Sequence, residues 1–128
     1  MIDPSSLGPD ILAFLAERHL ATLTTLRADG GPHVVPVGFS YSDADRIVRI
    51  ISSGSSVKAR NAARGGRAAV SQVDGGRWLT LEGHVRLVTD PARVATAVAG
   101  YAARYRQPAE RLDRIAIEID VDRIMGRA

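Results

Sequence analysis

The segment "RWLTLEGHVRLV", residues 77–88, alternates apolar and polar side chains along its whole length. A period of two is typical of a β-strand that packs one face on a core and leaves the other outside. The face predicted to be buried comprises Leu79, Leu81, Val85 and Leu87. The opposite face comprises Trp78, Thr80, Glu82, His84 and Arg86. The segment therefore predicts a long, half-buried strand in a mainly β domain.

The neighbouring segments predict five further strands joined mostly by tight turns. "RAAVSQV" (67–73) comes before a "DGG" turn, and "HLATLTTLRADGGPHVVPVGFSY" (19–41) has the pattern of a hairpin. "RIVRIISS" (46–53) follows a second turn. The last strand, "RIAIEIDVDRI" (114–124), places isoleucines on one face and Glu118, Asp120 and Asp122 on the other. We interpret these three carboxylates as solvated groups at a sheet edge.

Three short helices complete the prediction. The first covers residues 9–18, where Pro9 suits the first helical position. The second begins within 53–56 and ends at the glycines 65–66, and the third runs from Asp90 to the Gln-Pro pair at 107–108. Six strands and three helices predict an antiparallel α+β domain spanning residues 1–128, most economically a small barrel. Such a barrel has little interior, so a large ligand is expected on its outside or between subunits.

Composition narrows the possible functions. The 128 residues are 45% hydrophobic and 24% charged and include no cysteine, as expected of an ordinary globular domain without thiol chemistry. No apolar run approaches the ~18–20 residues that span a bilayer, and the N-terminus does not resemble a signal peptide, so we expect a cytoplasmic protein without membrane contact. The pI is about 9.9. However, the net charge is only +3, the arginines are scattered and aromatic residues make up 5%, so nucleic-acid binding is not expected.

Motifs for metal binding and covalent catalysis are absent from the sequence. His19, His33 and His84 fall on three different predicted strands, without cysteine partners or an i,i+4 pair, so no metal is expected. The sequence has no G-x-S-x-G element. "GSSVKARN" lacks the second glycine and the Lys-Ser/Thr ending of a phosphate-binding P-loop. We assign no catalytic side chain.

The segment "ISSGSSVKARNAARGG" (51–66) is the strongest candidate for a binding site. All but one of the 17 basic residues are arginines, and the exception, Lys58, follows a serine-rich turn where a strand passes into a helix. Hydroxyls at Ser52 and Ser56, unpaired helix N–H groups, and Lys58 and Asn61 on one helix face, with Arg60 nearby, would suit a phosphate. A capped surface helix that carries basic residues explains the same pattern.

The single tryptophan, Trp78, is predicted on the polar face of its strand. Such a ring can anchor an interface or stack on a ligand, and it can also be a half-buried surface residue. The pattern leaves these alternatives open.

Four segments in this order resemble the flavin and deazaflavin split β-barrel superfamily, of which the pyridoxamine 5'-phosphate oxidases are the best-known branch. The segments are "LATLTTLRADGGPHVVPVGF", "SSGSSVKARNAARGGRAAVSQVDG", "RWLTLEGHVRLV" and "IEIDVDRIMG", and they cover nearly the whole chain. "FLAERHLATLTTLRADG", "VSQVDGGRWLTLEG" and "ARYR" are especially similar to the coenzyme F420-dependent biliverdin reductases of actinobacteria.

The resemblance implies a homodimer of six-stranded split barrels, of the type that binds flavin mononucleotide (FMN), with cofactor sites at the subunit interface. By similarity, the cofactor phosphate would lie on Ser56, Lys58 and Asn61, with Arg60 along the path of the cofactor tail. The ring would lie near Pro36, Val37 and Ser52, and Gln72 and Trp78 would close the site.

The activity implied by the resemblance is hydride transfer from reduced F420 to a small conjugated acceptor such as biliverdin, with solvent as the proton source. FMN-binding relatives use several basic residues on separate strands, including further lysines, and this chain has only Lys58. That difference favours F420 as the cofactor. The alternatives are an FMN-binding enzyme similar to pyridoxamine 5'-phosphate oxidase and a non-catalytic protein that binds a flavin, a deazaflavin or a tetrapyrrole.

Overall fold

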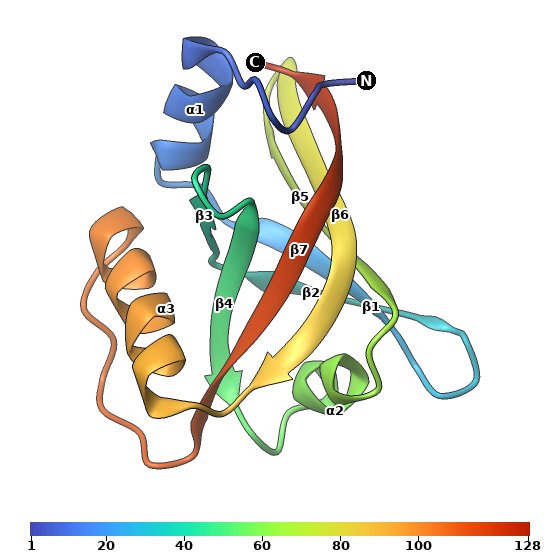
Figure 1. The fold of residues 1–128 in the computed structure, drawn as a ribbon, viewed down its shortest axis with the longest axis vertical. Coiled ribbons are helices and arrows are strands. Elements are labelled where there is room, and N and C mark those ends of the chain that lie inside the picture. Colours follow the sequence, from blue (N-terminus) through green and yellow to red (C-terminus); the bar gives the residue numbers. More distant parts are fainter.

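The computed structural model describes residues 1–128 and is built on one antiparallel sheet (Figure 1). Its order is β2-β1-β5-β6-β7-β4-β3. The strands are β1 (Ala21–Leu26), β2 (Pro32–Val37), β3 (Ser40–Ser42), β4 (Ile47–Ser53), β5 (Arg67–Asp74), β6 (Arg77–Val88) and β7 (Arg114–Arg127). The mainly β, antiparallel architecture predicted from the sequence is confirmed. The predicted number of strands, six, is wrong, because there are seven.

The additional strand arises where the second arm of the predicted hairpin divides. Residues 33–41 were expected to form one strand, but β2 ends at Val37 and β3 begins at Ser40. The Phe39 N–H donates to the Tyr105 hydroxyl (3.2 Å), and the Phe39 carbonyl accepts from Arg104 (2.8 Å). Because both backbone groups of Phe39 bind side chains, they are not available for a strand ladder.

The two longest strands, β6 and β7, form the centre of the sheet. They pair from Trp78 opposite Arg127 to Val88 opposite Ala116, with one irregularity between Glu82 and Gly83. A Cβ atom added at Gly83 would lie 1.7 Å from the Asp120 carbonyl oxygen. This backbone contact excludes any side chain at Gly83, so a glycine is required there.

The core lies inside the curled sheet. Leu79 and Leu81 are fully buried, as the alternation of residues 77–88 predicted, whereas Trp78 and His84 are exposed. One apolar cluster contains residues from strands at both halves of the sheet, among them Leu23, Val37, Val48, Val70, Leu81 and Ile117. Strands that are distant in the sheet order thus share one core, as the closed shape of a barrel requires.

The helices are shorter than predicted but lie where the sequence signals placed them. They are α1 (Pro9–Ala16), α2 (Val57–Ala63) and α3 (Pro91–Arg104). Ser56 and Asp90 cap α2 and α3 by accepting from the Ala59 and Arg93 N–H groups. Helix α3 lies beside β4, and α2 lies at the end of the sheet where β4 and β6 finish (Figure 1). No helix is long and apolar enough to cross a membrane.

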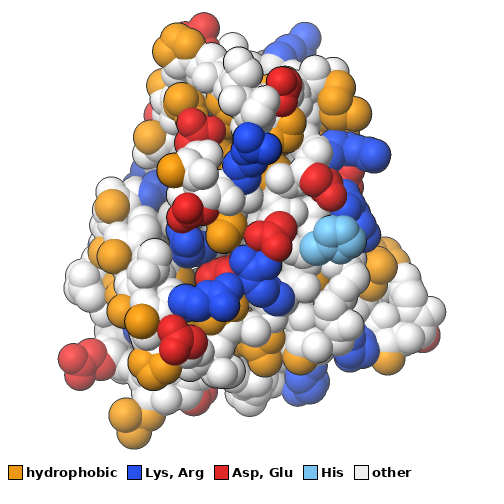
Figure 2. Space-filling model, in the orientation of Figure 1, with side chains coloured by type: hydrophobic (Ala, Val, Ile, Leu, Met, Phe, Trp, Pro, Cys, Tyr) orange, Lys and Arg blue, Asp and Glu red, His pale blue; other side chains and the backbone are white.

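Glu118 corrects the prediction of solvated edge carboxylates. Strand β7 lies between β6 and β4 rather than at an edge, and the Glu118 side chain is only 1% exposed. Its carboxylate accepts hydrogen bonds from Arg86 (2.9 Å) and Arg93, and Arg49 lies 3.9 Å away. Acidic and basic side chains accordingly alternate on this face of the molecule, over β4, β7 and β6 (Figure 2). Glu118 is the buried anion that joins these strands to α3.

The arginines determine the charge state of Glu118. Burial alone would raise the pKa of this carboxyl group, but hydrogen bonds from Arg93 and Arg86 outweigh burial and hold the pKa below its usual 4.5. A lowered pKa in the folded state stabilises the fold fully above the unfolded-state pKa. That stabilisation is lost as the pH falls through the lowered value.

We expect Glu118→Gln to lower the free energy of unfolding at pH 7 by about 3–5 kcal/mol, because it leaves several arginines without their shared anion. Urea unfolding measures this loss. Asp122→Asn is the matched control, because Asp122 pairs with Arg67 at the surface and should contribute at most ~1 kcal/mol. The difference between wild type and Glu118→Gln should also shrink as the pH falls below ~4.5. Equal losses for the two variants, or a difference that does not depend on pH, would contradict this account.

Candidate functional site

A hollow of about 300 Å³ opens where β4 passes into α2. The end of β4 and the capping turn of α2 form one side of it. The other side is the start of β7, because Ser53 pairs with Arg114 across the two strands and the Gly54 N–H donates to the Asp113 carbonyl (2.9 Å). The lining residues are Ile51, Ser52, Ser53, Ser56, Lys58, Arg111 and Arg114.

Hydroxyl groups form the serine side of the hollow. The Ser52 and Ser56 oxygens are 3.0 Å apart, and the Ser56 hydroxyl donates to the Ser53 carbonyl (3.0 Å). Ser56 also accepts from the Ala59 N–H (3.1 Å), which fixes its orientation as the helix cap. These contacts hold the serine hydroxyls in place at the wall of the hollow.

Cationic side chains form the rest of the wall. Lys58 is half-buried, and neither Lys58 nor Arg114 forms an ion pair or a side-chain hydrogen bond. Arg111 pairs only with its neighbour Asp113, at 3.3 Å. Three cations and three serine hydroxyls around one small cavity, with one carboxylate beside them, provide a donor set that suits a phosphate or another compact anion.

Two residues that were predicted with Lys58 lie outside the hollow. Asn61 is buried on the other side of α2, where its amide donates to the Thr25 hydroxyl (3.0 Å) and its oxygen accepts from Arg64 (2.5 Å). Lys58 and Asn61 were expected to present one common face to a ligand, and this expectation is wrong because Asn61 faces inward. Arg60 is exposed, and its guanidinium donates to the Ser55 carbonyl at 2.9 Å.

Of the residues predicted to surround a ring, Ser52 lines the hollow, whereas the others lie on the sheet outside the lining of the hollow. Pro36 is exposed near the end of β2, and Val37 beside it is buried. Trp78 is 37% exposed on β6. Gln72 is 1% exposed, and both ends of its amide are engaged, since it donates to the Phe14 carbonyl and accepts from Arg104. Gln72 is thus a structural residue that supports the sheet, and we assign it no direct ligand contact.

Sequence reasoning missed Arg111 and Arg114. Both are far from Lys58 in the chain, and among many scattered arginines nothing local marks them. They come to the hollow through the pairing of β4 with β7. The charged half of the site therefore depends on strand order, which the local pattern does not specify.

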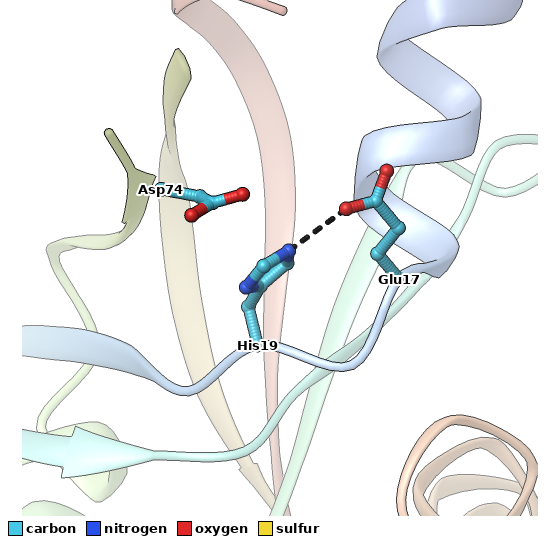
Figure 3. Close-up of side chains that lie close together, drawn as sticks. All are labelled: Glu17, His19 and Asp74. Carbon is cyan, nitrogen blue, oxygen red and sulfur yellow. Dashed lines mark hydrogen bonds and ion pairs between the residues drawn. The ribbon is translucent and has the colours of Figure 1, made fainter. Parts of the chain in front are cut away.

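A second cluster of polar side chains lies at the end of α1. Donor atoms of Glu17, His19 and Asp74 lie within 4.8 Å of one another, and His19 is 3.0 Å from the Glu17 carboxylate (Figure 3). The guanidinium of Arg77 binds both Glu17 oxygens (2.9 Å each) and Asp74 (2.5 Å), and hydrogen bonds from Arg77 and His19 lower the pKa of Glu17 to about 2. Arg77 already supplies the positive charge of this cluster, which we interpret as an ion-pair network.

The curled antiparallel sheet has the architecture of a split β-barrel, and the hollow at the β4–α2 turn presents a donor set that suits a compact anion. The pyridoxamine 5'-phosphate oxidase family model matches residues 7–127. The chain belongs to this family, and the resemblance inferred from the sequence is confirmed.

Individual relatives narrow this classification. An F420H(2)-dependent biliverdin reductase of Mycobacterium tuberculosis is 52% identical over 95% of this chain and 89% of its own length. Two solved structures share the fold. A conserved hypothetical protein of M. tuberculosis has a TM-score of 0.79 at 21% identity, covering 95% of this chain and 85% of its own. An F420 reductase has a TM-score of 0.72 at 24% identity, covering 88% and 94%.

Proposed function

We propose that the protein is a coenzyme F420-dependent reductase and that biliverdin is its acceptor. The observation that carries this proposal is the 52% identity, over nearly the whole chain, to a protein named for that cofactor and that substrate. The family alone leaves the choice between flavin and deazaflavin open. The single lysine of the site and this relative both favour the deazaflavin.

The hollow supports the proposal because its donors fit the phosphate of such a cofactor. Lys58 supplies a compact, unpaired charge and Ser52 and Ser56 supply oriented hydroxyls, while Arg114 faces them from β7. Lys58, Arg111 and Arg114 carry more positive charge than one phosphodiester can neutralise. The remaining positive charge suits the acidic tail expected of F420. In this proposal Arg111 and Arg114 replace Arg60 as the residues along the tail.

The ring of the cofactor is proposed to lie along the end of β2, near Pro36 and Val37, with Trp78 closing the site. When bound, reduced F420 supplies a hydride. The chain holds the phosphate end and presents a rigid sheet to the ring, so that donor and acceptor carbons can approach to roughly 3–3.5 Å. We propose water as the proton source.

A second subunit completes the proposed site. The outer face of β2, β1, β5 and β6 exposes four apolar side chains: Leu26 (44%), Val34 (56%), Val73 (67%) and Trp78 (37%). The strand register divides them into two groups on this face. Val73 lies opposite Trp78 near the β5–β6 turn, and Leu26 lies diagonal to Val34 near the β1–β2 turn. Thr22, opposite Ser71, and Thr24, opposite Ala69, lie between the two groups. An apolar sheet face of this kind is typical of a homodimer interface.

We expect anaerobic mixing of the protein with reduced F420 and biliverdin to oxidise the cofactor and form bilirubin, with NADPH inactive as donor. Absorbance of the cofactor and of both pigments follows the reaction. Binding of F420 without turnover would favour the non-catalytic alternative. Stoichiometric FMN that F420 cannot displace would favour the FMN-binding alternative.

Lys58→Ala should weaken F420 binding about ten- to hundredfold, because it removes one charge-assisted contact of roughly 1.5–3 kcal/mol. The value of kcat at saturating cofactor should change little, since a contact remote from the ring binds ground and transition states about equally. Fluorescence titration gives the affinity. Arg60→Ala is the matched control, because Arg60 lies on the same helix outside the hollow and should lose less than ~threefold. Similar losses at both positions would show that Lys58 contributes only general surface charge.

The chain should be a stable homodimer in solution that buries more than ~1,200 Å² in total. Val73→Glu and Trp78→Glu should shift it toward monomer and weaken F420 binding, because each places a charge on the exposed apolar pair that these two residues form. Light scattering gives the mass, and Arg123→Glu, beyond this apolar pair on β7, is the control. A wild-type monomer at micromolar concentration with full cofactor affinity would refute this part of the proposal.

A further inference from the structure

We propose that Arg104 and Tyr105, at the C-terminal end of α3, are positioning residues that fix the strand end next to the cofactor ring. The inference rests on the proposed function, because it takes Pro36 and Val37 as neighbours of the ring. It concerns the corner that follows them, Gly38–Phe39, where β2 turns into β3.

The backbone of this corner is held by side chains from α3 instead of a strand. Tyr105 accepts from the Phe39 N–H (3.2 Å), and Arg104 donates to the Phe39 carbonyl (2.8 Å). The Arg104 guanidinium also lies 4.6 Å from the centre of the buried Phe39 ring. Two consecutive residues thus bind the amide, the carbonyl and the ring of one corner residue.

Close packing adds to this contact at Gly38. A Cβ atom added there would lie 2.9 Å from the Tyr101 ring and 3.0 Å from the Tyr105 ring. The two rings are themselves in contact, with their centroids 4.9 Å apart. The corner therefore fits against both tyrosines only because residue 38 has no side chain.

The same two side chains also anchor the segment between α1 and β1. The Tyr105 hydroxyl donates to the His19 carbonyl (2.5 Å), and Arg104 donates to the Glu17 carbonyl (2.7 Å) and to Gln72 on β5 (2.7 Å). The corner is consequently fixed relative to β1, which pairs with β2 up to Val37 opposite Ala21. Arg104 and Tyr105 therefore hold both the corner that follows β2 and the segment that leads into β1.

The distance requirement of hydride transfer makes this pair important for rate. A displacement of ~1 Å at the reacting carbons can lower the rate by ~100-fold, whereas binding of a remote phosphate is insensitive to it. Loosening the corner should therefore lower kcat and leave the phosphate end unaffected. This is the reverse of the pattern expected for Lys58→Ala.

The test is Tyr105→Phe, which removes one hydroxyl and keeps the ring that packs on Gly38. Tyr101→Phe is the matched control, because the Tyr101 hydroxyl forms no hydrogen bond in the protein, although its ring also packs on Gly38. In the cofactor-free protein, amide hydrogen exchange at Phe39 should be about tenfold faster in Tyr105→Phe than in wild type, and unchanged in Tyr101→Phe. With saturating F420, kcat should fall about tenfold in Tyr105→Phe only, and the F420 dissociation constant should change less than ~threefold.

A second variant, Arg104→Lys, should give the same two effects, because the single nitrogen of a lysine cannot reach the three separate acceptors that Nε, Nη1 and Nη2 of Arg104 contact. Equal Phe39 exchange in the two tyrosine variants would refute the corner contact itself. Faster exchange with an unchanged kcat would refute the positioning role. If wild type binds no F420 or shows no turnover, the proposed function fails, and the exchange measurement still decides whether the corner is held as described.

Discussion

The contact on which the rest of this structure depends is a cation surrounded by neutral oxygens. The Arg104 guanidinium donates to the Glu17 and Phe39 carbonyls and to the Gln72 amide oxygen, with no carboxylate among its hydrogen-bond partners. Burial lowers the pKa of Arg104, yet a guanidinium stays protonated in a protein. The loss of hydration is offset only when several N–H groups find acceptors. The connection after α1, the β2–β3 corner and β5 therefore all have to be in place before this charge is accommodated.

This dependence explains which parts of the fold could be read from the sequence. Periodicity predicted the strands and the buried Leu79 and Leu81, because which face of a strand is buried is encoded in its own residues. The division of β2 from β3 was missed because the acceptor and the donor for the Phe39 backbone lie 66 and 65 residues away, respectively. Glu118 was misassigned for a related reason. A charged residue on the outer side of a strand has the same local pattern whether it faces water or arginines from other elements.

The candidate site divides in the same way. Ser52, Ser56 and Lys58 were found because the turn, the cap and the single lysine lie in one short segment. Arg111 and Arg114 were not found, because they reach the hollow only through the pairing of β7 with β4 and lie far from Lys58 in the chain. Asn61 was placed with Lys58 on spacing alone. Its short side chain instead faces inward and holds α2 against β1 through Thr25. Helical spacing thus predicted the correct helix but the wrong direction for the Asn61 side chain.

The solitary lysine also makes the hollow chemically distinguishable from the rest of the surface. Arginine guanidinium groups do not react with ordinary acylating reagents. Among the side chains, such a reagent therefore has one amine to label, that of Lys58, which is half-buried at the wall of the hollow. A covalent label on the Lys58 amine would place a reporter at one known position of the cavity without any engineered residue. The arginine-rich composition thus leaves the protein with a natural, nearly unique point of attachment at the mouth of its candidate site.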